Sequence, residues 1–416
     1  MRYLKPFLIL SAFLGLASVW TMGRAAAAGA SRSQFGQPLD GLTLDDRKVF
    51  RDAKDTFEEV EDAADGLGPI FNGVSCAACH STPAVGGSSG INETRAQRKT
   101  AQGQFELPGG SLFQSQAIRP DCAEVIPPDA NVIAQRQTTP LFGSGLIEAI
   151  PDAQIEAYAN LEALVYPNQA GRVNHITDVA SGKTRVGRFG WKDQHATLLA
   201  FSGDAYVNEM GITNKFFPTE NAPNGDLNKL HACDAVPDPE DKSDDVTAFA
   251  NFMRMLAPPP RDFEWDRLQQ TFRNRIFEFY RNPRNSQQVR ALPRIARGEL
   301  LFEEVGCAIC HRSGFTTVST KPALNRQKVE AYSDFLLHDI GTGDGIIQGD
   351  PQSVNELRTP PLWGISASAP YLHDGSAASI RDAIERHDNQ AAGPRKAFDQ
   401  LSGSEQDALL AFLDSI

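Results

Sequence analysis

The chain lacks features that mark several protein classes. It has no excess of basic residues, since 40 Lys and Arg stand against 52 Asp and Glu, and its formal net charge is −12. This balance argues against nucleic acid or an anionic membrane as the main partner. Beyond residue 28 it has no apolar run long enough to span a bilayer. The rest of the composition is globular, with 41% hydrophobic and 22% charged residues in 416, and this length allows two or three domains with sizeable cores.

The single long apolar run lies at the start of the chain. Arg2 and Lys5 precede it, and four alanines ending at Ala28 follow it. This order is typical of a secretory signal peptide. The alternative, an uncleaved membrane anchor, fits less well because the run is shorter than the ~20 residues that a span needs. We therefore expect residues 1–28 to be a signal peptide cleaved near Ala28, and the mature protein to be periplasmic with no membrane span.

Four of the six cysteines stand in two copies of one motif: Cys76-Ala-Ala-Cys79-His80 and Cys307-Ala-Ile-Cys310-His311. The C-x-x-C-H spacing attaches c-type haem, because two thiols one helical turn apart bind the vinyl groups and the histidine ligates the iron. A zinc site or thioredoxin-like redox pairs are the alternatives, but a redox pair does not need the histidine. The sequence therefore predicts two covalently bound c-type haems, with His80 and His311 as iron ligands.

The remaining cysteines, Cys122 and Cys233, lie in polar, loop-like sequence. In an oxidising compartment we predict a structural disulfide between them. Two free thiols are the alternative, although nothing nearby in the sequence lowers a thiol pKa.

Similar landmarks follow each haem motif. Residues 138–143 resemble residues 359–364, and Trp191 and His373 lie 182 positions apart within a second matching pair of segments. Such self-similarity indicates a duplicated unit. The sequence thus predicts a mostly α fold, with two cytochrome-c-like haem domains related by duplication.

The domain boundary is predicted at three consecutive prolines, because proline cannot continue a helix. They lie in a linker, 258–262, between an N-terminal domain, 29–257, and a C-terminal domain, 263–416. Apolar periodicity and the capping box Ser402-x-x-Glu405 predict helices before each haem motif and at the end of each domain: about 44–60, 244–256, 287–304 and from 402 onward. Segments 81–131 and 214–241 are rich in Gly, Pro, Ser and Asp, and we expect them to be long irregular loops.

Methionine is scarce, and this bears on the iron ligands. It occurs only at positions 1, 22, 210, 253 and 255, so the second domain contains none and its haem cannot have His/Met ligation. The candidates for its sixth ligand are His338, His373 and His387. We favour His387, which lies about two turns into a predicted helix that includes Ile380.

In the first domain, the position 182 residues before His387 is Ala205, which cannot bind iron. We therefore expect an open iron where a small ligand can react. The alternatives for a sixth ligand there are Met210, His175 and His195.

Several segments resemble a known family: residues 66–72, 187–192, 208–213, 332–341, 358–364 and 371–375. The chain is similar to the di-haem oxidoreductase, putative peroxidase family, also labelled putative thiol oxidoreductase. More distantly it resembles the bacterial di-haem cytochrome c peroxidases. A thiol activity has no support here, because attachment consumes the four motif cysteines and the other two lack a C-x-x-C arrangement.

The resemblance to the peroxidases implies that the N-terminal haem binds peroxide and the C-terminal haem relays electrons. Trp191 falls where those enzymes have a tryptophan between the haems, and Glu209 falls where they have a distal glutamate. His387 falls where they have a methionine ligand, a difference that lowers the expected reduction potential.

We therefore expect hydrogen peroxide reduction at the N-terminal haem, with Glu209 as general acid and base, Glu148 as its rival, and Trp191 either in electron transfer or in core packing. The expected donor is a small cytochrome c or another periplasmic redox protein. The alternatives are an electron-transfer cytochrome and a redox partner in iron uptake. Calcium has no support in the sequence.

Overall fold

The computed structural model describes residues 34–261 and 293–416. By their contacts these residues belong to one compact unit. The predicted signal peptide, part of the linker 258–262 and the start of the helix expected at 287–304 lie outside the described residues. Among the helices that the structure describes, none combines the length and the apolar character needed to cross a bilayer.

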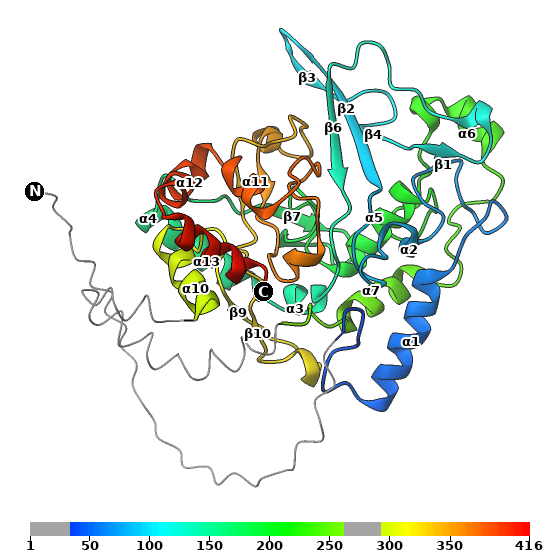
Figure 1. Cartoon of the computed structure of the whole chain (residues 1–416). Helices are drawn as coiled ribbons and strands as arrows, with labels where there is room; N and C mark the ends of the chain where they lie inside the picture. The colour runs from blue at the N-terminus through cyan, green and yellow to red at the C-terminus, as the bar shows by residue number, and fades with distance from the viewer. Residues whose placement is uncertain (1–33, 262–292) are drawn as a thin grey trace, which may run out of the picture. The chain divides into compact units, whose positions relative to one another are not determined.

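In both halves of the described chain more residues lie in helices than in strands, with irregular segments between them (Figure 1). The α-helices are α1 Leu44–Glu58, α2 Cys76–Cys79, α3 Ser144–Glu148, α4 Asp152–Val165, α5 Leu198–Glu209, α6 Leu227–Cys233, α7 Asp245–Met255, α10 Arg294–Glu304, α11 Ile380–Glu385, α12 Ala392–Asp399 and α13 Gly403–Leu413. Short 3₁₀ helices lie at Pro120–Cys122, Pro223–Gly225, Pro322–Leu324, Pro351–Val354, Ile365–Ala367 and Asn389–Ala391.

The helices predicted before each C-x-x-C-H motif and at the end of each domain are confirmed where their residues are described. At the start of α1 the Thr43 hydroxyl accepts the Asp46 N–H at 3.1 Å, and at α13 the Ser402 N–H donates to the Glu405 carboxylate at 2.9 Å. Both are capping boxes. In each half the helix before the C-x-x-C-H motif packs on the last helix, α1 on α7 and α10 on α13. We propose that this equivalence reflects duplication.

The prediction of irregular loops at 81–131 was wrong in part, because strands lie within this segment at residues 92–100, 103–105, 112–113 and 116–117. The strands are β1 Ile70–Phe71, β2 Asn92–Thr100, β3 Gly103–Phe105, β4 Leu112–Phe113, β5 Gln116–Ala117, β6 Val132–Gln137, β7 His175–Asp178, β8 Lys183–Val186, β9 Phe315–Thr316, β10 Lys328–Val329, β11 Leu337–His338 and β12 Leu357–Arg358. β2 pairs antiparallel with β3, β4 and β6 in a four-stranded sheet, with Arg95 opposite Ala134 of β6. The remaining strands form antiparallel pairs: β1 with β5, β7 with β8, β9 with β10, and β11 with β12.

The predicted disulfide is confirmed. Cys122 and Cys233 are bonded with an S–S distance of 2.10 Å and link the segment after β5 to α6. Segment 214–241 is therefore a loop that contains a helix and is tied to the sheet side of the first half.

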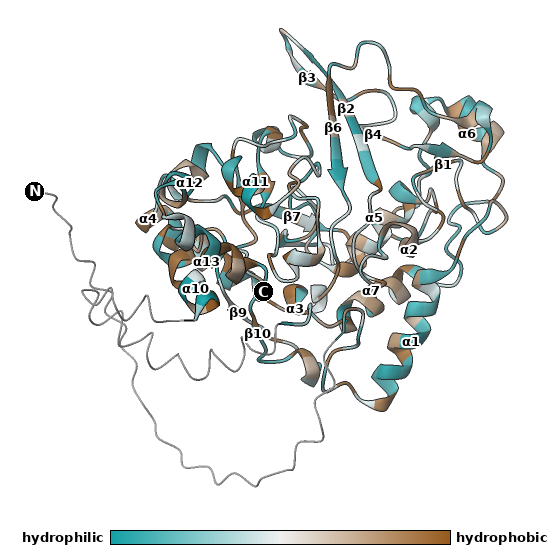
Figure 2. Ribbon diagram, viewed as in Figure 1, coloured by the Kyte–Doolittle hydropathy of each residue, from teal (hydrophilic) through white to brown (hydrophobic). Residues whose placement is uncertain are grey.

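The main hydrophobic core draws on both halves. Phe57 of α1 packs against Phe252 of α7 with ring centroids 4.7 Å apart, and the same core includes Phe315 and Phe335 from the second half. Figure 2 shows α7 in apolar colours and much of α1 in polar colours, in keeping with a buried α7 and a partly exposed α1. A second core forms between α10, α13 and α12.

Candidate active site: two haem cavities

The first C-x-x-C-H motif forms a single helical turn. The Ser75 hydroxyl accepts the Ala78 N–H at 3.0 Å and begins α2, so that Cys76 and Cys79 lie one turn apart. His80 follows, and its Nδ1 lies 2.9 Å from the Gly87 carbonyl oxygen. Because Nδ1–H donates to this carbonyl, Nε2 carries a lone pair. Burial lowers the pKa of His80 to about 4, so the ring is neutral, as an iron ligand must be.

The second motif repeats this arrangement. The Nδ1 atom of His311 lies 3.0 Å from the Tyr332 carbonyl oxygen, and burial lowers the pKa of His311 to about 4. His387 lines the same cavity of about 260 Å³, and its Nδ1 lies 2.7 Å from the Ala383 carbonyl oxygen. Both histidines thus keep Nε2 for a metal, and this donor set fits a bis-histidine haem. His387 lies two residues beyond α11, which ends at Glu385, and not within the helix as expected.

The other two histidines of the second cavity differ from His387. His338 has Nε2 2.9 Å from Asp334 and Nδ1 3.8 Å from the Cys310 sulfur, so both of its nitrogens have partners. His373 is buried, its Nδ1 has no hydrogen-bond partner, and its ring lies 6.2 Å from the Trp191 ring. Of the three candidates for the sixth ligand, His387 and His373 therefore each have a ring nitrogen without a hydrogen-bond partner in the described structure.

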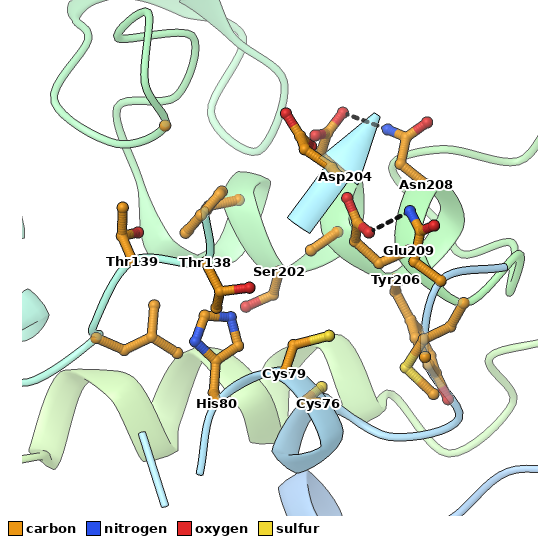
Figure 3. Close-up of a pocket in the computed structure, with 18 of the residues that line it drawn as sticks. Cys76, Cys79, His80, Thr138, Thr139, Ser202, Asp204, Tyr206, Asn208 and Glu209 are labelled. Atoms are coloured by element: carbon orange, nitrogen blue, oxygen red, sulfur yellow. Dashed lines mark hydrogen bonds between the residues drawn. The ribbon is translucent and has the colours of Figure 1, made fainter. Parts of the chain in front are cut away.

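The first cavity, of about 170 Å³, lies between the first motif and α5. Figure 3 shows His80 projecting toward Ser202, with Asp204 and Glu209 on the α5 side of the space. Ala205 lines the cavity and offers no ligand atom, whereas Met210 lines it and has a sulfur.

The two histidines considered as alternative ligands in the first domain do not line this cavity. His175 is exposed on β7 with Nε2 2.9 Å from Glu156. His195 has Nε2 3.1 Å from Asp204. Neither is placed to reach an iron held by His80.

Glu209 lies at the C-terminal end of α5 and is fixed from two directions. Its carboxylate accepts the Asn72 side-chain N–H at 2.8 Å, and its carbonyl oxygen accepts the backbone N–H groups of Asn72 and Gly73. Burial, followed by the charge of Glu93, raises the pKa of Glu209 to about 8. This carboxyl group therefore exchanges a proton near neutral pH, which is the property that a general acid and base needs.

The rival acid, Glu148, has a different environment. Its carboxylate accepts hydrogen bonds from Arg254 at 2.6 Å and from the Leu198 backbone N–H at 2.7 Å, and it lines neither cavity. Glu148 holds the N-terminus of α5 to α7 and is not placed to meet a substrate in the first cavity.

Sequence reasoning missed the basic side of the first cavity. Arg95 of β2 and Arg136 of β6 line it, and both pair with Glu93, at 2.7 and 3.4 Å. Arg136 also lies 2.7 Å from Asp344, which in turn is 2.8 Å from Lys192. Segment 92–98 shows no alternation of apolar residues that would predict a strand. The density of charged residues there is the signal that could have indicated this basic side of the cavity.

Two short stretches of chain border both cavities. Thr138, Thr139, Gly190 and Trp191 line both of them. The Trp191 indole N–H donates to the Gln137 carbonyl at 3.0 Å, and the Trp191 carbonyl accepts the Arg358 N–H at 2.8 Å. This shared wall (Thr138, Thr139, Gly190 and Trp191) thus has contacts to both halves.

Two cavities, each with a neutral histidine beside a pair of cysteines, define a di-haem redox protein. The chain belongs to the family described as "Di-haem oxidoreductase, putative peroxidase", whose model matches residues 125–251 and 283–416, more than half of the sequence. The second motif lies inside the matched residues and the first precedes them. The protein is thus a di-haem oxidoreductase of the peroxidase-like type, with haem as its cofactor.

Comparison with individual proteins gives more distant similarities. The chain is 34% identical over 76 residues to the cytochrome-c peroxidase IdrP2 of Denitromonas iodatirespirans, covering 18% of this chain and 20% of that one. It is 23% identical over 171 residues to a cytochrome c551 peroxidase of Nitrosomonas europaea, covering 41% and 43%. The chain thus matches less than half the length of these relatives. Among solved structures, Kuenenia stuttgartiensis hydrazine synthase shares 17% identity over 97% of this chain and 100% of that chain, with a TM-score of 0.41.

Proposed function

We propose that this protein reduces hydrogen peroxide at the haem held by Cys76, Cys79 and His80. The observation that carries the proposal is the cavity wall opposite His80, where Ala205 provides no ligand and Glu209, one helical turn further along α5, provides a carboxyl group with a pKa near 8. Family membership and the similarity to two cytochrome peroxidases support the same reaction.

The residues of the chain supply proton transfer and charge. When bound, a haem held by Cys76, Cys79 and His80 would supply an iron that can bind peroxide and pass electrons to it. Glu209 in its charged form takes the proton from one peroxide oxygen and returns it to the other, which leaves as water. Arg95 lines the cavity and favours the charged form of Glu209. Two electrons and two further protons convert one peroxide molecule to two water molecules.

We propose that the electrons arrive through the second haem, ligated by His311 and His387 and held by Cys307 and Cys310. Trp191 belongs to the shared wall and packs edge-on against His373 of the second cavity. In this proposal the Trp191 ring assists electron transfer between the two cavities that it lines. The donor in this proposal is a small cytochrome c or a similar redox protein, and the protein is exported with both haems covalently attached.

The test is electron paramagnetic resonance of the ferric and half-reduced protein, before and after peroxide. We expect one high-spin haem whose signal peroxide removes, and one low-spin bis-histidine haem. Two low-spin haems that ignore peroxide would overturn the proposal.

A second candidate function rests on Met210. This buried residue lines the first cavity, and as a sixth ligand it would close the iron and leave an electron-transfer cytochrome. Replacement Met210→Leu distinguishes the two candidate functions. If the protein is an electron-transfer cytochrome, the first haem should change from low to high spin, whereas a peroxidase should show no change.

A further inference from the structure

A group of three carboxylates lies outside both haem cavities. One oxygen each from Glu220, Asp238 and Glu240 lies within 4.8 Å of the other two. None of the three lines either haem cavity. All three belong to the segment that the Cys122–Cys233 disulfide ties to the sheet side of the molecule.

Of the three carboxylates, Glu220 is the one whose charged form the described residues stabilise least. Its side chain is buried, with 7% exposed, and neither carboxylate oxygen has a hydrogen-bond partner. The charged neighbours that act on it are Glu240, Asp238 and Asp234, all acidic, while the Asn221 backbone N–H has a smaller opposing influence. Burial raises the pKa of Glu220 to about 10. A buried carboxylate that faces other carboxylates needs a cation or a proton.

Glu240 and Asp238 are held in place by the protein. The Glu240 carboxylate accepts the Thr213 N–H at 2.8 Å, and the Thr213 hydroxyl donates to Asp238 at 2.5 Å. Gly66 has a φ of +107°, and a Cβ there would come within 2.9 Å of the Glu240 side chain. The carboxylates are therefore positioned before any ligand arrives.

We propose that Glu220, Asp238 and Glu240 bind a calcium ion. The ligands are all oxygen, as calcium prefers, and calcium–oxygen distances are about 2.3–2.6 Å. Two oxygens at such a distance from one ion are separated by no more than twice that length, which the 4.8 Å spacing satisfies. Magnesium binds at about 2.0–2.1 Å and keeps several waters, so it fits this partly buried group less well.

The calcium would join Glu220 to the stretch from Asp238 to Glu240, and the residues that hold this stretch lead to Glu209. Thr213, which orients two of the ligands, lies four residues after Glu209. The Gly68 N–H donates to the Met210 carbonyl at 3.0 Å, so the chain around Gly66 is also attached to the end of α5. The site does not depend on peroxide chemistry, and it holds whether or not Glu209 acts in catalysis.

Isothermal titration of the haem-loaded, chelator-treated protein with calcium chloride tests the proposal. We expect one calcium per chain and weaker binding of magnesium. Replacement Glu220→Gln should lower the calcium affinity by at least about tenfold. Calcium should also raise the thermal midpoint of the wild type but not of the variant, because binding to the folded state alone stabilises it.

The matched control is Asp234→Asn, which removes the same charge from the same segment without touching the three ligands. We expect it to lower the calcium affinity much less than Glu220→Gln does, because Asp234 is not one of the three ligands and acts on Glu220 through its charge. Absence of calcium binding by the wild type, or equal losses in Glu220→Gln and Asp234→Asn, would show that the group is held by shared protons and would overturn the proposal. None of these readouts depends on peroxide turnover.

Discussion

At the scale of single residues, Glu209 has the most direct expected effect on turnover. It must be charged to accept a proton, and its pKa is raised to about 8 by burial. Turnover should therefore increase as the pH rises through about 8 and be lost as the pH falls. Replacement Glu209→Gln should lower peroxide turnover by about 100- to 10,000-fold and abolish this pH dependence. Steady-state assays across pH measure both.

The control for that variant is Glu124→Gln. Glu124 is half-buried, and its two carboxylate oxygens accept the Gln114 and Asn224 backbone N–H groups, one each, so an amide keeps one of these two hydrogen bonds. It lines neither cavity, so activity and pH profile should match the wild type. A Glu209→Gln variant as active as this control would remove Glu209 from the mechanism.

His387 should control the potential of the second haem. Methionine in place of a histidine ligand raises the reduction potential, so His387→Met should shift this haem upward by on the order of 0.1 V within the ~0.8 V that axial ligands span. Spectroelectrochemical titration measures the shift. If the potential of this haem is unchanged while its spectrum stays bis-histidine, His373 is the ligand instead.

The residues that sequence analysis could identify are those with a local signature. The two C-x-x-C-H motifs are contiguous, and the lack of methionine after position 255 is a matter of counting. Arg136 and Asp344 are different, because their pairing depends on contacts between residues over 200 positions apart. No local pattern encodes such a pair.

At the scale of elements, the packing of α10 on α13 depends on Gly298. A Cβ at this position would lie 2.0 Å from the Ala408 carbonyl oxygen, so Gly298→Ala must push the two helices apart. We expect a loss of about 1–3 kcal/mol in the free energy of unfolding, as for other overpacked cores. Chemical denaturation followed by far-ultraviolet circular dichroism measures it.

Gly403→Ala provides the comparison within the same helix pair. Gly403 is the first residue of α13, and a Cβ there meets nothing within 4 Å. Alanine is the better helix former by up to about 1 kcal/mol, so this variant should be as stable as the wild type or more so. Equal destabilisation by both substitutions would contradict the close crossing at Gly298.

The elements differ in how much their sequences reveal. Helices α1, α7 and α13 carry end signals or apolar faces, and they were predictable. Strand β2 was not, because Asn92 to Thr100 is polar apart from Ala96 and its buried face meets other polar side chains. A strand that is polar on both faces leaves no alternation to detect.

At the scale of the whole molecule, the two halves are joined by buried charges. Asp344 from the second half lies between Arg136 and Lys192 of the first, and the side chains of Asp344 and Lys192 are fully buried. Replacement Asp344→Asn would remove the carboxylate that both Lys192 and Arg136 contact, and would leave Arg136 paired with Glu93. We expect it to cost about 3–5 kcal/mol of unfolding free energy, measured by denaturant titration.

An exposed ion pair between the same halves serves as the control. Asp350 lies 2.9 Å from Arg172, and both side chains are more than a quarter exposed. Asp350→Asn should cost no more than about 1 kcal/mol. Similar losses from the two substitutions would mean that burial of Asp344 does not determine its contribution.

The shared wall makes the surroundings of the two haems depend on the same residues. Because Gly190 and Trp191 border both cavities, a substitution there changes the surroundings of two irons at once. A substitution of Gly190 or Trp191 therefore cannot change the reduction potential of one haem without affecting that of the other. Independent adjustment is left to residues that line one cavity alone, such as Glu209 in the first and His387 in the second.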